Sequence, residues 1–222
     1  MSESSPNILV LCADDVCLAP AAADQLRASL QFRDRGHVAV RSAGIRALEG
    51  RPWCPESRHL VRVEGCQAGE HLARQVTSSM VRQADLVLTT ERRFRGAGRM
   101  LDVHSAGRTF TILEAAALAR AAMQGAGVQG AGDRRGPHPG YESLDSPLGA
   151  LVDEMDFLRG LVTLPAPPSA WRTRFSRTPV RGPDVVDPHG AGGSHRRALD
   201  AMHEACLVLA DAVAWCAQSA MA

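Results

Sequence analysis

ILVLCADDVCLAP, residues 8–20, sets the architecture expected for the whole chain. The apolar run at its start predicts a buried strand, and the Ala-rich pattern Ala21–Leu30 that follows predicts a helix. A tight loop between a strand and a helix directs backbone N–H groups and the positive end of the helix toward one point, where an anion can bind. Cys12 heads this loop, in the kind of position that favours a reactive thiolate.

Apolar strands alternate with helical stretches along the rest of the chain. The strands are expected at Ile8–Leu11, His37–Arg41, Asp85–Thr89 and Thr109–Leu113. The helices are expected at Ala21–Leu30, Pro55–Glu64, Ser78–Arg82, Leu148–Leu164 and Arg196–Gln218. This alternation predicts an α/β fold: a four-stranded parallel sheet with helices on both faces. A ligand site is then expected at the carboxyl ends of the strands, where the Cys12 loop lies.

Residues 8–27 resemble the signature of the low-molecular-weight protein tyrosine phosphatases, V-C-x-G-N-x-C-R-S-P. Cys12 falls on the nucleophile of that pattern, Cys17 on its second cysteine and Pro20 on its proline, and Val16 is the variable position between them. The remaining loop positions depart from the pattern: Asp14 replaces glycine, Asp15 asparagine, Leu18 arginine and Ala19 serine.

Further segments carry the same resemblance in the same order along the chain. They are the S-A-G turn at 42–44, the H-x-A-R-Q element at 71–75, the A-D-L-V-L strand at 84–88 and a D-V-x-D-P-x-G motif at 184–190. The resemblance implies that Ser42 and His71 support the loop through hydrogen bonds. His189 stands where the family has a tyrosine, and it is expected either to line the pocket or to be a solvated turn residue.

The resemblance also implies a reaction. The Cys12 thiolate would attack phosphorus, an arginine at position 18 would clamp the phosphoryl oxygens, and Asp187 would protonate the leaving group. Leucine offers none of the donors of a guanidinium, and losing one preorganised oxyanion donor commonly costs about 10²–10³ in rate. Carboxylates at positions 14 and 15 also repel a phosphate and raise the pKa of a nearby thiol. We therefore expect a weak or inactive pseudophosphatase that acts by binding.

Three alternatives remain open at this stage. The first is an active phosphatase for aryl phosphates or phosphotyrosine, with an arginine supplied from elsewhere: Arg41, Arg46, Arg74 or Arg172. The second is thiol redox chemistry, since one class of arsenate reductases shares this fold, and Cys12 and Cys17 are spaced as in family members that form a reversible disulfide. The third is a magnesium or calcium site built from the oxygen-rich set Asp14, Asp15, Asp187 and His189.

The expected organisation is a single domain over residues 1–222 with a family-atypical insertion at about 119–183. The insertion holds a Gly-rich stretch at 125–132 and the proline-rich stretch Pro165–Pro168. It is expected to be a surface insertion or a lid over the site, and it offers a surface for a protein partner.

Composition limits the classes of partner. The formal net charge is +1 over 222 residues, so no global field recruits nucleic acid or a membrane. No apolar run is long enough to span a bilayer and the first residues lack a signal-peptide pattern, so a cytoplasmic protein is expected. The six cysteines include no C-x-x-C pair, so free thiols and no metal or other cofactor are expected. The implied ligand is a phosphorylated protein or a small aryl phosphate.

Overall fold

Parallel strands form the centre of the protein in a computed structural model that describes residues 5–125, 146–162, 184–191 and 193–219. The strands are β1 (Asn7–Cys12), β2 (Ala39–Gly44), β3 (Leu86–Thr89) and β4 (Thr109–Thr111). They form a four-stranded sheet in the order β2-β1-β3-β4, and every neighbouring pair is parallel. Within this sheet Cys12 pairs with Gly44, which places the Cys12 loop at the carboxyl edge. The predicted fold class is confirmed.

Helices account for most of the other described residues. They are α1 (Leu18–Phe32), α2 (Pro55–Val63), α3 (Ser78–Gln83), α4 (Arg92–Leu101), the 3-10 helix η1 (Val103–Arg108), α5 (Ile112–Met123), α6 (Pro147–Leu158), α7 (Pro188–Ala191) and α8 (His195–Ser219).

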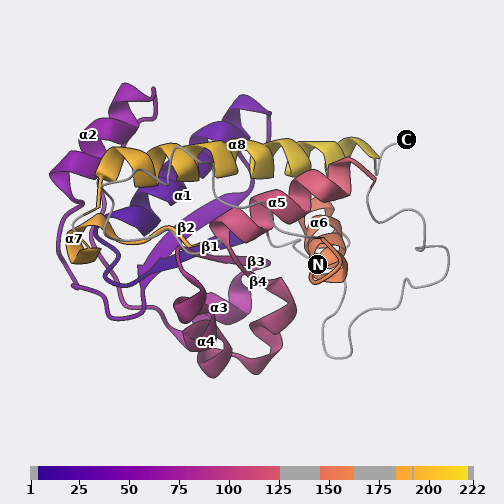
Figure 1. Ribbon diagram of the computed structural model, residues 1–222, viewed down its shortest axis with the longest axis horizontal. Helices are drawn as coiled ribbons and strands as arrows, with labels where there is room; N and C mark the ends of the chain where they lie inside the picture. Colours follow the sequence, from indigo (N-terminus) through magenta and orange to yellow (C-terminus); the bar gives the residue numbers. More distant parts are fainter. Residues whose placement is uncertain (1–4, 126–145, 163–183, 192, 220–222) are drawn as a thin grey trace, which may run out of the picture.

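Helices cover both faces of the sheet, and successive residues of β1 point to opposite faces. Ile8 and Val10 join the larger core cluster, to which α1, α5, α6 and α8 contribute. Leu9 and Leu11 join a smaller cluster that includes residues of α3 and α4. Figure 1 shows the long α8 lying along α1 and α5 on one side of the sheet, with α3 and α4 on the other. Both faces of β1 are therefore buried, as its apolar sequence requires.

All four strands differ from their predicted boundaries, most of all the second and the fourth. The second strand begins at Ala39 rather than His37 and continues to Gly44. The fourth ends at Thr111 rather than Leu113, because Thr111 caps α5. Its side chain accepts a hydrogen bond from the Glu114 N–H, and the Glu114 side chain accepts one from the Thr111 N–H. This capping box commits residues 112 and 113 to α5. The sequence analysis predicted neither α5 nor α4.

Part of the expected insertion belongs to the folded core. α6 buries Leu148, Leu151 and Met155 and packs against α5 and α8. It is shorter than the helix expected to reach Leu164, because Arg159 at its C-cap already has an extended backbone. The Gly-rich and Pro-rich stretches, the proposed lid and Arg172 lie outside the described residues.

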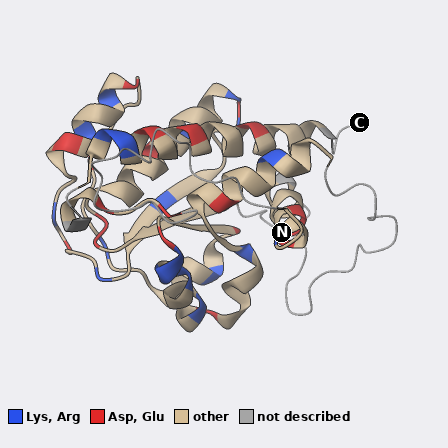
Figure 2. Cartoon of the chain, viewed as in Figure 1, with Lys and Arg blue, Asp and Glu red and all other residues tan. Residues whose placement is uncertain are grey.

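Charges of both signs are spread over the described helices, with arginines most concentrated on α4 (Figure 2). Several of these arginines are paired: Arg93 with Glu91 at 2.7 Å and Arg95 with Glu114 at 3.1 Å. In the described part of the chain, no helix is long and apolar enough to cross a membrane.

Candidate functional site

The loop after β1 is held by its backbone carbonyls. The carbonyls of residues 12, 13 and 14 accept hydrogen bonds from the N–H groups of residues 45, 46 and 48 at 2.8–3.0 Å. The Asp15 carbonyl accepts one from His71 Nε2 at 2.7 Å, and the Val16 carbonyl accepts one from the Cys54 N–H at 2.8 Å. Five successive carbonyls thus bind the surrounding scaffold, and the loop keeps a defined shape.

Close packing of the loop on the S-A-G turn requires glycine at position 44. A Cβ on Gly44 would lie 2.9 Å from the Asp14 carbonyl carbon and 3.0 Å from the Ala13 oxygen, both backbone atoms that cannot give way. Asp15 itself has a φ of 60°, in the left-handed region, which asparagine and aspartate tolerate better than most residues. The family's asparagine and the aspartate found here therefore suit the same backbone.

The Cys12 thiol lies inside this loop and is only 2% exposed. Its sulfur accepts a hydrogen bond from the Asp15 N–H at 3.2 Å. Burial raises the pKa of the Cys12 thiol far above its ordinary value, and the Asp14 carboxylate raises it further. The N–H groups of Ala19 and Asp15 lower it by less. The raised pKa disfavours the nucleophilic thiolate that the resemblance implies.

Asp14 places a carboxylate within the anion-binding loop. Its Oδ1 accepts a hydrogen bond from the Val16 N–H at 3.1 Å and from the Cys12 thiol at 3.7 Å. A phosphate bound in this loop would need those same donors. The protein's own carboxylate therefore occupies part of the hydrogen-bonding capacity that an anionic ligand would use.

Asp15 is buried beneath the loop and is fully covered. Its Oδ2 accepts a hydrogen bond from the Arg74 backbone N–H at 3.1 Å and lies 3.4 Å from His71 Nε2. Burial alone would lower the pKa of His71, but its hydrogen bonds and charge contact with Asp15 outweigh this and raise the pKa. Asp15 and His71 thus form a structural pair that fixes the loop at Asp15.

The positions of the family's arginine and serine have become part of the apolar core. Leu18 is 1% exposed and Ala19 is fully buried, and both begin α1 within the larger core cluster. Ser42 is likewise buried, in β2, and its carbonyl accepts a hydrogen bond from Arg74 Nε at 2.8 Å. Leucine at position 18 therefore contributes packing where the resemblance implies a cation.

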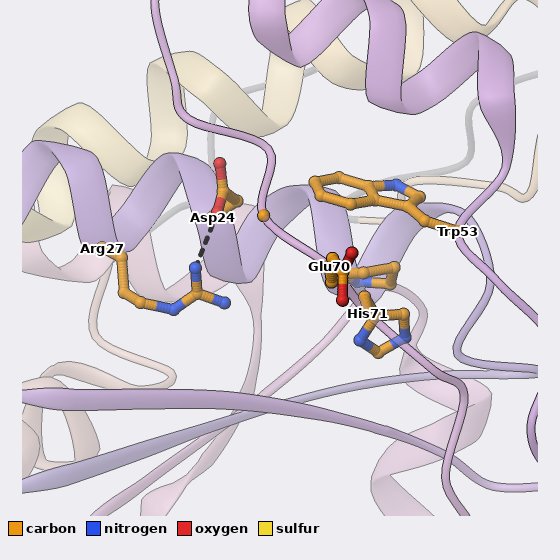
Figure 3. A pocket seen from close by; sticks show the side chains of 7 residues that line it. Asp24, Arg27, Trp53, Glu70 and His71 are labelled. Atoms are coloured by element: carbon orange, nitrogen blue, oxygen red, sulfur yellow. Dashed lines mark hydrogen bonds and ion pairs between the residues drawn. The ribbon is translucent and has the colours of Figure 1, made fainter.

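None of the described arginine side chains replaces the missing cation. Among the described residues, no guanidinium donates a hydrogen bond to loop residues 12–19. The Arg74 guanidinium binds the Ser42 carbonyl, and Arg41 and Arg46 are exposed. Arg27 lines a shallow pocket together with Trp53, Glu70 and His71, but it is paired with Asp24 at 2.7 Å (Figure 3). Its Nε also donates to the Val40 carbonyl at 3.2 Å, so both ends of this guanidinium are engaged.

Asp187 is bound to the histidine two residues after it. Its Oδ1 accepts a hydrogen bond from the His189 N–H at 2.8 Å and lies 3.1 Å from His189 Nδ1. The segment that carries Asp187 is tied to β3 by the Val185 N–H, which donates to the Thr90 carbonyl at 2.7 Å. The carboxylate implied as a general acid is therefore engaged by an imidazole.

The alternative magnesium or calcium site, built from Asp14, Asp15, Asp187 and His189, is not assembled by the described residues. Within those ranges, the only group of three or more potential metal ligands is Cys17, Cys54, His189 and His195, whose ligand atoms all lie within 4.8 Å of one another. His189 thus belongs with thiols and a second histidine, not with Asp14 and Asp15. The sequence analysis missed Cys54 and His195, because these ligands come from segments far apart in the chain and carry no spacing motif.

Comparison with known proteins places the chain among phosphatases. Residues 7–124 match the family described as "Low molecular weight phosphotyrosine protein phosphatase". The chain is 40% identical over 85 residues to the probable low molecular weight protein-tyrosine-phosphatase EpsP of Ralstonia nicotianae, covering 38% of this chain and 55% of that protein. It is 35% identical over 92 residues to the low molecular weight protein-tyrosine-phosphatase Wzb of Escherichia coli, covering 39% and 56%. It spans about half the length of these curated relatives.

Solved structures agree on the fold. A YwlE mutant from Bacillus subtilis superimposes with a TM-score of 0.58 at 17% identity, covering 93% of this chain and 97% of that one. A protein tyrosine phosphatase from Entamoeba histolytica superimposes with the same TM-score of 0.58 at 15% identity, covering 92% and 94%. At such identities the likeness concerns the architecture alone.

Proposed function

Because this chain belongs to the low molecular weight phosphotyrosine protein phosphatase family, we propose that it retains the anion loop as a scaffold and acts by binding, with little or no hydrolysis. The observation that carries this proposal is the Asp14 carboxylate inside the loop, hydrogen-bonded to the Val16 N–H and the Cys12 thiol. This side chain opposes two requirements of phosphoryl transfer: it repels the phosphate, and it adds to the effect of burial in raising the pKa of the Cys12 thiol.

The rest of the site supports the same proposal. Position 18 holds a buried leucine where the transition state needs a guanidinium. Asp187 is hydrogen-bonded to His189. Each change alone weakens catalysis, and together they remove activation of the nucleophile, stabilisation of the phosphoryl group and delivery of the proton.

A protein bound outside the anion loop is the partner we propose. Two carboxylates at the loop disfavour the phosphorylated proteins and aryl phosphates that the resemblance implies. We propose that the region 119–183, most of which lies beyond the family match at residues 7–124, takes part in this binding. We place this activity in the cytoplasm, where the thiols of the protein stay reduced.

An aryl phosphate assay tests the loss of hydrolysis. The purified protein and its Cys12→Ser variant are compared with p-nitrophenyl phosphate, and we expect equal, background rates. Turnover by the wild type that disappears in Cys12→Ser would overturn the proposal and favour an active phosphatase with an arginine from elsewhere in the chain.

Calorimetry with inorganic phosphate tests the role of Asp14. The wild type should bind phosphate weakly, and Asp14→Asn, which removes the charge at nearly constant shape, should bind it more tightly. Equal affinities for both proteins would mean that the carboxylate does not occupy the anion site.

A further inference from the structure

Four potential metal ligands meet at the end of the loop, and neither Cys12 nor Asp14 is among them. Cys17 lies at the N-cap of α1, Cys54 at the N-cap of α2, His189 in α7 and His195 at the start of α8. Cys54 Sγ lies 3.5 Å from His189 Nε2 and 3.6 Å from His195 Nε2, and the two imidazole rings contact each other edge to face. Segments separated by more than a hundred residues therefore direct their donor atoms to one point.

Carboxylates orient both histidines from behind. His189 Nδ1 lies 3.1 Å from Asp187 Oδ1, and His195 Nδ1 lies 3.2 Å from Glu56 Oε2. Each carboxylate can accept a hydrogen bond from the Nδ1–H group, and in that neutral tautomer the Nε2 atom carries a lone pair. In each ring it is this Nε2 atom that faces the Cys54 sulfur. A carboxylate hydrogen-bonded to the outer nitrogen is the usual second partner of a metal-bound histidine.

A single thiol proton cannot pair with the lone pairs of both Nε2 atoms. The Cys54 thiol has one hydrogen and can donate it to one Nε2 atom, which leaves the other lone pair facing sulfur. The Cys17 thiol, completely buried, adds a fourth donor atom to the same group. A single cation at the centre would accept all four lone pairs at once.

We propose that Cys17, Cys54, His189 and His195 bind a structural zinc ion. The distances fit this ion: with Zn–S of about 2.3 Å and Zn–N of about 2.0–2.1 Å, a tetrahedral site separates sulfur from nitrogen by roughly 3.6 Å. The two measured separations are 3.5 and 3.6 Å. The site is independent of whether the loop hydrolyses phosphate, because Cys12 and Asp14 are not among its ligands.

The chemistry of the donors selects the metal. Thiolate and imidazole favour zinc over magnesium or calcium, which prefer oxygen. On binding, the two thiols release their protons to solvent, and two thiolates balance the 2+ charge of the ion, so a neutral unit is buried. Four protein ligands leave no open position for water, which is typical of a structural rather than a catalytic site. The exposed His189 leaves a path for the ion to enter.

Zinc at this point would fasten the end of the anion loop to the starts of α2 and α8. It would also keep Asp187 hydrogen-bonded to His189, so that this carboxyl group would not protonate a leaving group at Cys12. The site thus accounts for a contact of Asp187 that the implied phosphatase chemistry does not explain.

Metal analysis of the full-length protein tests the proposal. The protein is purified under reducing conditions, equilibrated with zinc and desalted. Its zinc content is measured by inductively coupled plasma mass spectrometry, and we expect about one zinc ion per chain. Replacement of zinc by cobalt should give the intense visible bands of a tetrahedral ion and a thiolate-to-cobalt charge-transfer band. Failure to retain zinc, a Cys17–Cys54 disulfide in its place, or an octahedral cobalt spectrum would overturn the proposal.

Matched variants locate the site. Cys54→Ser and His195→Gln should lose at least tenfold in zinc affinity. Cys66→Ser and His203→Gln, which alter a buried cysteine and a half-buried histidine outside the cluster, should retain it. Equal loss in all four variants, or no loss in the first two, would contradict the assignment. The cobalt spectrum of the wild type decides the matter even if a variant fails to fold.

Discussion

Cys12 and Cys17 stand at the two ends of one loop, yet their surroundings are opposite in kind. Cys12 is next to a carboxylate that accepts its thiol hydrogen. Cys17 is next to a second thiol and two imidazoles whose donor atoms lie within 4.8 Å. A carboxylate beside the first sulfur disfavours an anion, whereas thiol and imidazole groups around the second are the donors that the proposed zinc ion requires. One loop therefore places its two sulfur atoms among different groups.

The largest expected effect comes from restoring the anion site at the Cys12 end. Asp14→Gly, Asp15→Asn and Leu18→Arg combined should raise Cys12-dependent hydrolysis of p-nitrophenyl phosphate by at least about 10²-fold, because a guanidinium replaces an apolar side chain and two carboxylates are removed. The same triple variant with Cys12→Ser is the control. Leu18 is a core residue, so circular dichroism must show a folded protein. A folded variant without activity would show that the deficit lies elsewhere.

Zinc should stabilise the protein through the Cys17 end alone. At a free zinc concentration of 100–1,000 times Kd, ligand binding adds about 3–4 kcal/mol, which corresponds to roughly 10 °C in the melting temperature of a chain of this size. Cys17→Ala should lose this zinc-dependent shift, and Cys12→Ala should keep it. Differential scanning fluorimetry with and without a chelator measures both. A similar shift in the two variants would remove the distinction between the two sulfurs.

The stability of the protein should depend on Asp15 as a hydrogen-bond acceptor rather than as a charge. Asp15→Ala removes the acceptor of the part-buried Arg74 N–H and places alanine at a φ of 60°. We expect a loss of about 1–3 kcal/mol in the free energy of unfolding. Asp15→Asn retains an acceptor and the tolerance for this backbone, and it should lose less. Urea denaturation compares the two, and equal losses would assign the effect to the charge.

The smallest effect concerns pH. The pKa of His71 is raised by Asp15 in the folded protein, so its contribution to stability is complete below the unfolded value of about 6.5. It is lost as the pH rises through the higher folded value. Relative to His71→Gln, the wild type should therefore be more stable at pH 6 than at pH 8. Urea denaturation at both values and constant saturating zinc tests this, and a difference of opposite sign would contradict it.

The sequence was sufficient to predict the backbone of the site but not which side chains from distant segments meet there. Ile8–Leu11 and the motif residues at 42–44, 71–75 and 84–88 identified the sheet and the loop, because each depends on local pattern and local turns. The start of α5 was misassigned as strand, although Thr111 and Glu114 form a capping box that can be recognised in sequence. Cys54 and His195 could not be linked, since only the packing of α8 over α1 and α2 brings them together.

The hydrogen-bonded carbonyls of residues 12–16 affect how this protein can change by mutation. Main-chain atoms, which every amino acid shares, provide most of the hydrogen bonds between the loop and its surroundings. Replacement of a side chain at position 14, 16 or 19 therefore alters what the loop can react with while its path through space persists. A protein built in this way can lose an enzymatic activity in a few substitutions and still present a rigid, recognisable surface on which a different role can develop.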